Sequence, residues 1–143
     1  MKNHTSFLFF ALILAMPSAF AQRNIDSILK KKSAKIQYGT ASFYAGKFQG
    51  RKTAIGEPYD QNKMTCAHNS LPLGIWVKVT NLRNHKSVYV RVTDRLHHKN
   101  KRLVDLSRAA AAKLGYLKRG LTRVKVEVLS RKPPLVEKKL PKR

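Results

Sequence analysis

The sequence has a single cysteine and only seven acidic residues, against thirty lysines and arginines. One cysteine excludes a disulfide within the chain, so the stability of the fold must come from packing. Cys66 lies in a short apolar run, where a small, half-buried strand residue is a simpler interpretation than a thiol nucleophile. Because carboxylates are so scarce, those that stand in loops are the first candidates for functional groups.

Long apolar runs are equally scarce, and the one that exists lies near the start of the chain. Residues 7–20 are apolar and follow a short basic segment, and residues 19–21 (Ala-Phe-Ala) fit the small-residue pattern of a cleavage site. This predicts a secretory signal peptide over residues 1–21, since the run is short for a membrane-spanning helix; an uncleaved anchor is the alternative. No cysteine lies near the cleavage site, so we expect a periplasmic or secreted protein without a lipid anchor or stable membrane insertion.

The charge balance gives a formal net charge of +23 at pH 7. Such a charge favours polyanionic partners, of which nucleic acid is the commonest. Export argues against nucleic acid, so we expect anionic cell-envelope polymers or membrane surfaces instead. About 120 residues remain after the signal peptide, which is enough for one domain with a real core, and we expect a monomer.

Composition divides the rest of the chain into three parts. Residues 22–36 are polar and basic and predict a mobile arm. Residues 37–130 carry most of the aromatic and β-branched residues and predict the folded domain. Residues 131–143 are rich in proline and lysine and predict a basic, disordered tail.

Alternation of apolar and polar residues predicts several short strands. The pattern is clearest over residues 75–80 and 87–93, which have the period of two of a half-buried antiparallel hairpin. Ser107 is a good N-cap for a helix over residues 108–114, which Gly115 would end. Short strands with one small helix favour a mainly β, compact and closed structure. The remaining strands are expected over residues 38–44, 64–67, 103–106 and 123–129.

Three of the seven acidic residues stand at conspicuous places. Glu57 and Asp60 fall within four residues, in a loop that also contains a glycine and a proline. Asp94 stands where the strand over residues 87–93 gives way to a loop, and His68 follows the strand over residues 64–67. A loop of this kind can hold acids against a substrate, but composition and periodicity do not identify that substrate.

Eight short motifs follow one another along the domain. They are Gly39-Thr40-Ala41-Ser42-Phe43-Tyr44, Gly50-Arg51-Lys52-Thr53-Ala54, Gly56-Glu57-Pro58-Tyr59-Asp60, Ala67-His68, Leu71-Pro72-Leu73-Gly74, Val77-Lys78-Val79-Thr80-Asn81-Leu82, Val90-Arg91-Val92-Thr93-Asp94-Arg95 and Val104-Asp105-Leu106-Ser107-Arg108-Ala109-Ala110. In this order and spacing they resemble the rare lipoprotein A family of double-psi β-barrel domains. The resemblance covers about residues 38–129, nearly the whole predicted domain.

The resemblance implies a six-stranded double-psi β-barrel with one short helix, a groove across it, and peptidoglycan glycan strands as the substrate. It also implies endolytic transglycosylation, which cleaves a MurNAc–GlcNAc bond and leaves a 1,6-anhydro-muramoyl end. The domain also looks like the barrel of expansins, so a non-catalytic peptidoglycan-binding module is the alternative. A cationic protein that binds envelopes through charge alone is a third hypothesis. The sequence departs from the family after Asp94-Arg95, where Leu96-His97-His98 replaces a frequent Gly-Pro.

Lytic cleavage needs an acid that protonates the departing glycosidic oxygen. It then needs a base that deprotonates the C6 hydroxyl of the same muramoyl sugar, and one carboxyl can do both in succession. Hydrolysis would instead need a water molecule, with a second carboxylate to activate or replace it. Asp94 matches the family's loop aspartate and is our candidate, the alternative being a simple Asp–Arg turn pair. Glu57 and Asp60 match the family's acidic pair and would orient sugar hydroxyls or act on Asp94 through their charge; an ordinary polar turn is the alternative. His68 is a candidate hydrogen-bond partner for a carboxylate or a sugar.

Candidate substrate-binding residues come from the same motifs. Tyr44 and Tyr59 would stack on sugar rings, and Arg51 and Arg95 would face anionic groups of the ligand. Asp105 has two interpretations. A similar aspartate in expansin-like barrels is a proposed catalytic residue, whereas a carboxylate just before a helix N-cap stabilises the helix by roughly 0.3–1 kcal/mol. We favour the second interpretation and keep Asp105 as a candidate substrate-binding residue.

We expect neither a metal nor another cofactor. The residues that could bind zinc show no spacing of an established zinc site. They are Cys66, His68, His97 and His98.

Overall fold

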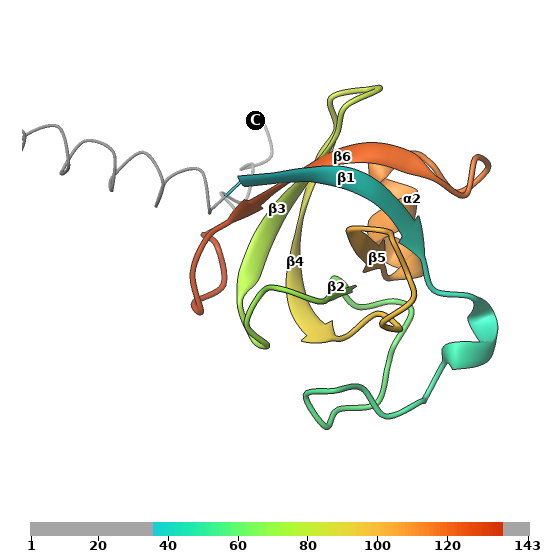
Figure 1. The fold of residues 1–143 in the computed structure, drawn as a ribbon, viewed down its shortest axis with the longest axis vertical. Helices are drawn as coiled ribbons and strands as arrows, with labels where there is room; N and C mark the ends of the chain where they lie inside the picture. Colours follow the sequence, from blue (N-terminus) through green and yellow to red (C-terminus); the bar gives the residue numbers. More distant parts are fainter. Residues whose placement is uncertain (1–35, 136–143) are drawn as a thin grey trace, which may run out of the picture.

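A computed structural model describes residues 36–135 of the 143-residue chain. It contains six strands, a short 3-10 helix and one α-helix (Figure 1). The elements are β1 (Ile36–Phe43), η1 (Gly46–Phe48), β2 (Thr65–His68), β3 (Trp76–Asn81), β4 (Ser87–Asp94), β5 (Val104–Leu106), α2 (Arg108–Leu114) and β6 (Thr122–Val128).

The predicted strands and helix agree closely with these bounds. Ile36, which we assigned to the basic arm, already belongs to β1. Residues 131–135, the described part of the predicted tail, lie outside any helix or strand. The signal peptide, residues 22–35 of the arm and residues 136–143 of the tail lie outside the described residues. Within residues 36–135, no helix is long and apolar enough to cross a membrane.

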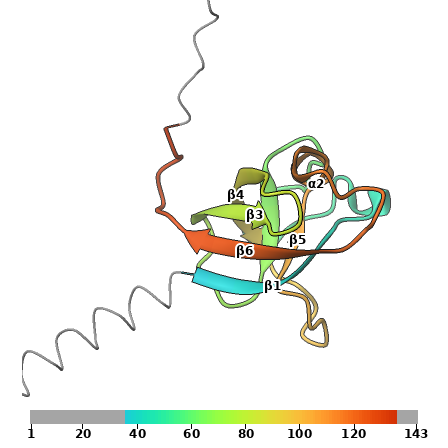
Figure 2. The ribbon, with the colours of Figure 1, turned by 90° about the horizontal axis from the view of Figure 1, so that it is seen from above.

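The strands close into a barrel in the order β1-β5-β2-β4-β3-β6, and β6 pairs again with β1 (Figures 1 and 2). Two pairings are parallel, β1 with β5 and β2 with β4, and the other four are antiparallel. Exchanging β1 with β4, β2 with β5 and β3 with β6 leaves the set of pairings unchanged. The two halves of the chain are therefore structurally equivalent in their pairing, and the expected six-stranded double-psi β-barrel is confirmed.

The core is built from the inward-facing residues of the strands. Alternate residues of β3 and β4 are fully or almost fully buried, as the period of two predicts. Cys66 corrects one expectation, because it is completely buried in β2 rather than half-buried. Burial raises the pKa of its thiol far above the usual range, so Cys66 is a small apolar core residue and not a nucleophile.

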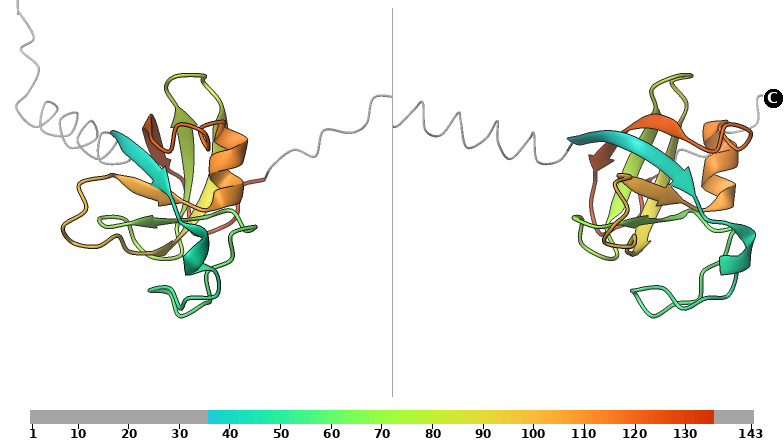
Figure 3. Two further views of the ribbon diagram at one scale, coloured as in Figure 1. Left: turned by 90° about the vertical axis from the view of Figure 1, so that its right-hand side faces the viewer. Right: turned by 45° about the vertical axis from the view of Figure 1, so that its right-hand side comes forward.

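Helix α2 covers one side of the barrel (Figure 3). It begins as predicted: the Ser107 hydroxyl oxygen accepts a hydrogen bond from the Ala110 amide at 3.2 Å. It ends at Gly115, whose φ of 74° is in the left-handed region that favours glycine. The side-chain amides of Asn81 and Asn84 both donate to the Leu114 carbonyl, at 3.0 and 2.9 Å. These bonds attach the end of the helix to the β3–β4 turn.

His68 ends β2 inside the protein, with 1% of its surface exposed. Its Nδ1 accepts hydrogen bonds from the backbone amides of Ser70 and Leu71, at 3.2 and 3.3 Å. The ring therefore fixes the turn that follows β2. Burial, and secondarily the positive charge of Arg95, lowers the pKa of His68 to about 4.

The first prediction concerns the dependence of stability on pH. Because the pKa of His68 is lower in the folded state than its ordinary value of 6.5, the unfolded state takes up the proton first as the pH falls. Stability is therefore complete above pH 6.5 and falls by about 3 kcal/mol as the pH is lowered from about 6.5 to about 4. Denaturant unfolding at a series of pH values measures this loss. In His68→Asn, which keeps an acceptor near Nδ1 but cannot ionise, the loss over this window should disappear; an unchanged pH dependence would contradict the assignment.

The second prediction concerns close packing in β1. A Cβ atom added at Gly39 would lie 2.6 Å from the Cβ of Leu103, too close for the backbone to tolerate without a shift. Gly39→Ala should therefore lower the free energy of unfolding by about 1–3 kcal/mol. Gly46→Ala is the matched control, because a Cβ there meets no atom within 4 Å. Chemical denaturation of both variants tests the difference, and equal effects would disprove the packing explanation.

Candidate active site

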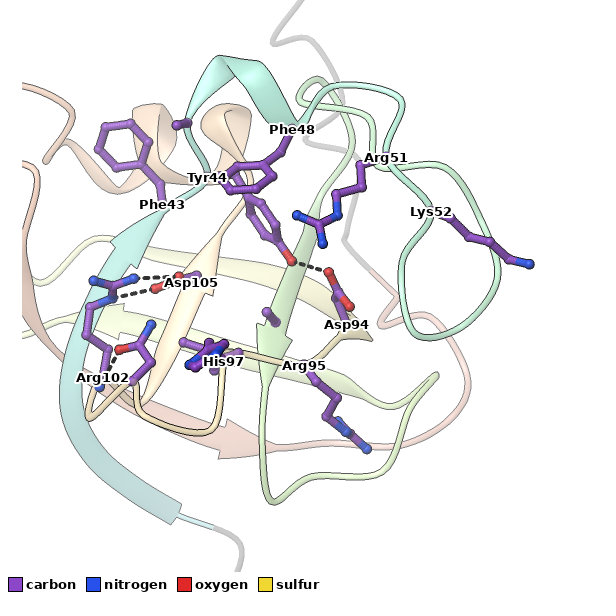
Figure 4. Close-up of a pocket in the computed structure, with 14 residues that line it drawn as sticks. Phe43, Tyr44, Phe48, Arg51, Lys52, Asp94, Arg95, His97, Arg102 and Asp105 are labelled. Carbon is purple, nitrogen blue, oxygen red and sulfur yellow. Dashed lines mark hydrogen bonds and ion pairs between the residues drawn. The ribbon is translucent and has the colours of Figure 1, made fainter.

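A cleft of about 610 Å³ lies where β1 and β4 end (Figure 4). Its walls come from the ends of these strands, from β2 and β5, and from the loops that follow β1 and β4. The lining residues are Phe43, Tyr44, Ala45, Phe48, Arg51, Lys52, Ala67, Asp94, Arg95, Leu96, His97, Asn100, Arg102 and Asp105.

Asp94 is held in this cleft through both carboxylate oxygens. The Tyr44 hydroxyl donates to Oδ2 at 2.8 Å, and the backbone amide of Ala54 donates to Oδ1 at 2.9 Å (Figure 4). Tyr44 follows the end of β1, Asp94 is the last residue of β4, and Ala54 belongs to the long β1–β2 loop. The carboxylate is therefore oriented by two neutral donors from separate segments of the fold.

Tyr44 is itself fixed by aromatic neighbours. Its ring stacks on that of Tyr59, with centroids 4.3 Å apart and planes 22° apart, and meets the edge of Phe48 at 5.9 Å. Burial, together with the hydrogen bond to Asp94, raises the pKa of the Tyr44 hydroxyl far above the usual range. The hydroxyl therefore remains protonated and acts as a donor to the carboxylate.

The two predicted stacking tyrosines lie in a different arrangement from the one we expected. Tyr59 lies against Tyr44, is only 4% exposed, and does not line the cleft. Its hydroxyl accepts a hydrogen bond from the Arg108 amide at 3.4 Å, and burial raises its pKa. Tyr59 therefore supports Tyr44 from beneath and offers no open face to a sugar.

Asp105 lies in the same cleft as Asp94 but has a different partner. Arg102 donates from Nε and from a terminal nitrogen to the two carboxylate oxygens, at 2.8 and 2.9 Å (Figure 4). This hydrogen bonding also raises the pKa of Arg102. Ser107 forms the N-cap bond of α2 as predicted, and Asp105, two residues before it, lines the cleft.

Cationic side chains surround the two carboxylates. Arg51 lies over the Phe48 ring, 5.5 Å from its centroid, and lines the cleft together with Lys52. Arg95 also lines it, but its side chain points away from Asp94 and donates to the His68 carbonyl at 2.6 Å (Figure 4). Among the ion pairs formed within residues 36–135, none joins Arg95 to Asp94.

Glu57 and Asp60 do not line the cleft that contains Asp94. Glu57 is exposed and pairs with Arg91 at 3.2 Å, and Asp60 accepts a hydrogen bond from the Asn62 amide within its own turn. The Glu57 carbonyl accepts bonds from the amide and hydroxyl of Thr53, which shape the loop that presents the Ala54 amide. His68, the fourth predicted catalytic residue, is buried behind the cleft wall.

Several residues of the cleft escaped the sequence-based prediction. The Ala54 amide gives no side-chain signal, and its role depends on the path of the loop. Arg102 stands three residues before Asp105, a spacing that hints at an ion pair, but only the β4–β5 loop brings the groups together. In the part of the chain that the structure describes, no three His, Cys, Asp or Glu residues gather as a metal site would require.

Solved structures with a similar fold include the Streptomyces papain inhibitor and an expansin of Clavibacter michiganensis. The inhibitor is 25% identical, with a TM-score of 0.54, over 66% of this chain and 94% of its own. The expansin is 24% identical, with a TM-score of 0.54, over 69% of this chain and 52% of its own. A variant of that expansin was solved in complex with cellohexaose.

Relatives whose sequences are more similar to this chain than those of the solved structures are named endolytic peptidoglycan transglycosylase RlpA. The protein of Neisseria meningitidis is 49% identical over 105 residues, which are 72% of this chain and 44% of the relative. That of Pseudomonas aeruginosa is 58% identical over 89 residues, which are 62% of this chain and 26% of the relative. The chain thus spans less than half the length of these relatives. The family model described as lytic transglycolase matches residues 36–126, almost the entire barrel. The chain therefore belongs to the lytic transglycolase family.

Proposed function

We propose that this protein is an endolytic peptidoglycan transglycosylase in which Asp94 acts first as the acid and then as the base. The observation that carries the proposal is the placement of Asp94, whose carboxylate is fixed by Tyr44 and Ala54 on the wall of an open cleft. Membership of the lytic transglycolase family and the names of the relatives, endolytic peptidoglycan transglycosylases, support the substrate and the reaction class.

The proposed reaction needs one carboxyl group in two successive steps. Protonated Asp94 gives its proton to the glycosidic oxygen as the bond from that oxygen to C1 of the muramoyl sugar breaks. The C6 hydroxyl of the same sugar then attacks C1, and its proton passes to the Asp94 carboxylate. The product is a 1,6-anhydro ring, and the enzyme returns to its starting protonation state without consuming water.

The kind of donor that holds each carboxylate supports this division of roles. The two donors that orient Asp94, the Tyr44 hydroxyl and the Ala54 amide, are neutral groups. Both oxygens of Asp105 are engaged by the Arg102 guanidinium. Asp105 is therefore poorly placed to activate a water, which favours lytic cleavage over hydrolysis. We assign it a positioning role in the substrate-binding wall.

The cations of the cleft suit an acidic glycan. Arg51, Lys52 and Arg95 line the site without a carboxylate partner among residues 36–135. Muramoyl sugars from which the stem peptide has been removed carry a free lactyl carboxylate, and a guanidinium binds a carboxylate with two parallel hydrogen bonds. We propose that these three residues bind the acidic groups of the strand on either side of the cleaved bond. We further propose that the protein acts outside the cytoplasm, where this substrate lies.

The third prediction tests the acid and base directly. Purified protein incubated with peptidoglycan sacculi should release muropeptides with 1,6-anhydro ends, identified by mass spectrometry. Asp94→Asn keeps the size of the side chain and removes its ability to transfer a proton, so release should fall by at least about 100-fold. Binding of the variant to sacculi should be retained, because the cations of the cleft are untouched.

Other outcomes distinguish the alternatives. Products with reducing ends would contradict lytic cleavage and identify a hydrolase. If the wild-type protein released no muropeptides but bound sacculi even in high salt, it would be a non-catalytic glycan-binding module. The exposed cations of the cleft would also serve that role. Binding that high salt abolishes would indicate attraction through charge alone.

The fourth prediction concerns the orientation of Asp94. Tyr44→Phe preserves the ring stack on Tyr59 but removes the donor to Oδ2. We expect kcat to fall by about 10- to 100-fold with little change in KM, since a hydrogen bond to a charged group contributes about 1.5–3 kcal/mol.

Tyr116→Phe is the matched control for this measurement. The Tyr116 hydroxyl is also buried and donates to the Ser42 carbonyl at 2.7 Å, but it does not reach the cleft. Its removal should lower stability and leave kcat unchanged. Equal losses of kcat in the two variants would mean that Tyr44 acts only through stability.

A further inference from the structure

A second hollow, of about 400 Å³, lies beside the β3–β4 turn. This turn precedes β4, whereas Asp94 is the last residue of β4, so the two sites lie at opposite ends of an eight-residue strand. At about 3.3 Å per residue the turn and Asp94 lie roughly 25 Å apart along this strand, while on β1 the two linings are closer, at Thr40 and Phe43. Figure 1 shows the turn on the side of the barrel opposite the long β1–β2 loop. The lining residues are Thr40, Leu82, Arg83, Arg119, Leu121, Thr122 and Arg123.

Three of these residues are exposed arginines, and none of the others is acidic. Five carboxylates lie within residues 36–135, and each is accounted for elsewhere. Three of them pair with cations, Glu57 with Arg91, Asp105 with Arg102 and Glu127 with Lys125, while Asp94 and Asp60 accept neutral hydrogen bonds. Arg83, Arg119 and Arg123 therefore line one hollow without a carboxylate partner among residues 36–135. Such an arrangement attracts a phosphate or carboxylate group.

Two exposed leucines complete the hollow. Leu82 is 37% exposed and Leu121 is 49% exposed, so each offers apolar surface beside the arginines. They come from different loops, the β3–β4 turn and the segment between α2 and β6. A simple polyanion would use the arginines and gain nothing from the leucines. An anionic amphiphile uses both, because its charged group and its apolar part meet at one boundary.

The segments that carry these residues are fixed to one another. The Leu82 amide donates to the Arg123 carbonyl at 2.9 Å. Beneath the hollow, the Thr122 hydroxyl donates to the Asn81 side-chain oxygen at 2.9 Å, and both residues are buried. The hollow is therefore formed by connected backbone, and a ligand would not have to order its walls before binding.

We propose that this end of the barrel binds the headgroup of an anionic phospholipid at a membrane surface. Arg83, Arg119 and Arg123 would contact the phosphate, and Leu82 and Leu121 would enter the apolar edge of the bilayer. Because the cleft with Asp94 lies at the other end of β4, a membrane-bound molecule would direct that cleft away from the bilayer. The site is separate from the cleft and does not depend on the proposed catalytic activity.

The fifth prediction tests this site by co-sedimentation with vesicles. The protein should bind vesicles of mixed phosphatidylglycerol and phosphatidylcholine and should not bind vesicles of phosphatidylcholine alone. The triple variant Arg83→Gln/Arg119→Gln/Arg123→Gln should partition roughly 100-fold less strongly. The double variant Leu82→Ser/Leu121→Ser, which keeps every charge, should bind about tenfold less strongly.

A second triple variant, Lys63→Gln/Lys99→Gln/Lys101→Gln, is the matched control. It removes the same charge from three exposed lysines outside the hollow and should lose less than about threefold in binding. Thermal unfolding of all variants verifies that they fold.

Three results would overturn the proposal. Equal loss in the two triple variants would show that only net charge matters. A polyanion site would be identified instead if the leucine variant bound vesicles as well as the wild-type protein and the arginine variant lost as much affinity for soluble polyphosphate as for vesicles. Absence of binding to phosphatidylglycerol vesicles by the wild-type protein would exclude a membrane role for this surface.

Discussion

Two parallel strand pairings determine where the site of this protein lies. In the barrel β5 lies between β1 and β2, and β2 lies between β4 and β5, so the connections that follow β1 and β4 join strands that are not neighbours and must cross an end of the barrel. Both crossings begin where these strands finish, and they form the two loops that line the cleft. Tyr44 follows the end of β1 and Asp94 ends β4, and the hydrogen bond between them joins the two halves directly. The cleft is thus a consequence of the topology.

The scarcity of acidic residues gives the cleft its electrostatic character. Only Asp94 and Asp105 supply negative charge there, and each carboxylate oxygen already has a donor. Of the cations around them, Arg51, Lys52 and Arg95 have no carboxylate partner among residues 36–135, so the cleft combines two oriented carboxylates with an excess of positive charge. This combination is the basis on which we propose an acidic polysaccharide as the substrate.

The sequence predicted the regular parts of the fold well. The period of two located β3 and β4, and the chemistry of Ser107 and Gly115 set both ends of α2, because these signals depend on local geometry alone. The position of Asp94 at a strand end was also correctly anticipated, since motif order and strand pattern agree there.

Burial in a closed barrel was much harder to anticipate. The local pattern of apolar and polar residues does not reveal that a short strand such as β2 has neighbouring strands on both edges. For this reason Cys66 was expected to be half-buried. Glu57 and Tyr59 belong to one of the family's motifs, and this likewise suggested that they share the cleft with Asp94. In the structure, the loop turns Glu57 outward to Arg91 and places Tyr59 beneath Tyr44. These outcomes depend on the path of a loop, which residue spacing does not encode.

The pairing of β1 with β6 also constrains how the molecule is made. Ile36 lies opposite Glu127, so the first strand has no partner along one edge until the last strand is available. The barrel cannot close around its core on a partly synthesised chain, and folding must bring together residues about ninety positions apart. Such a high contact order predicts slow folding. The barrel therefore closes only once β6 has been synthesised and has reached β1.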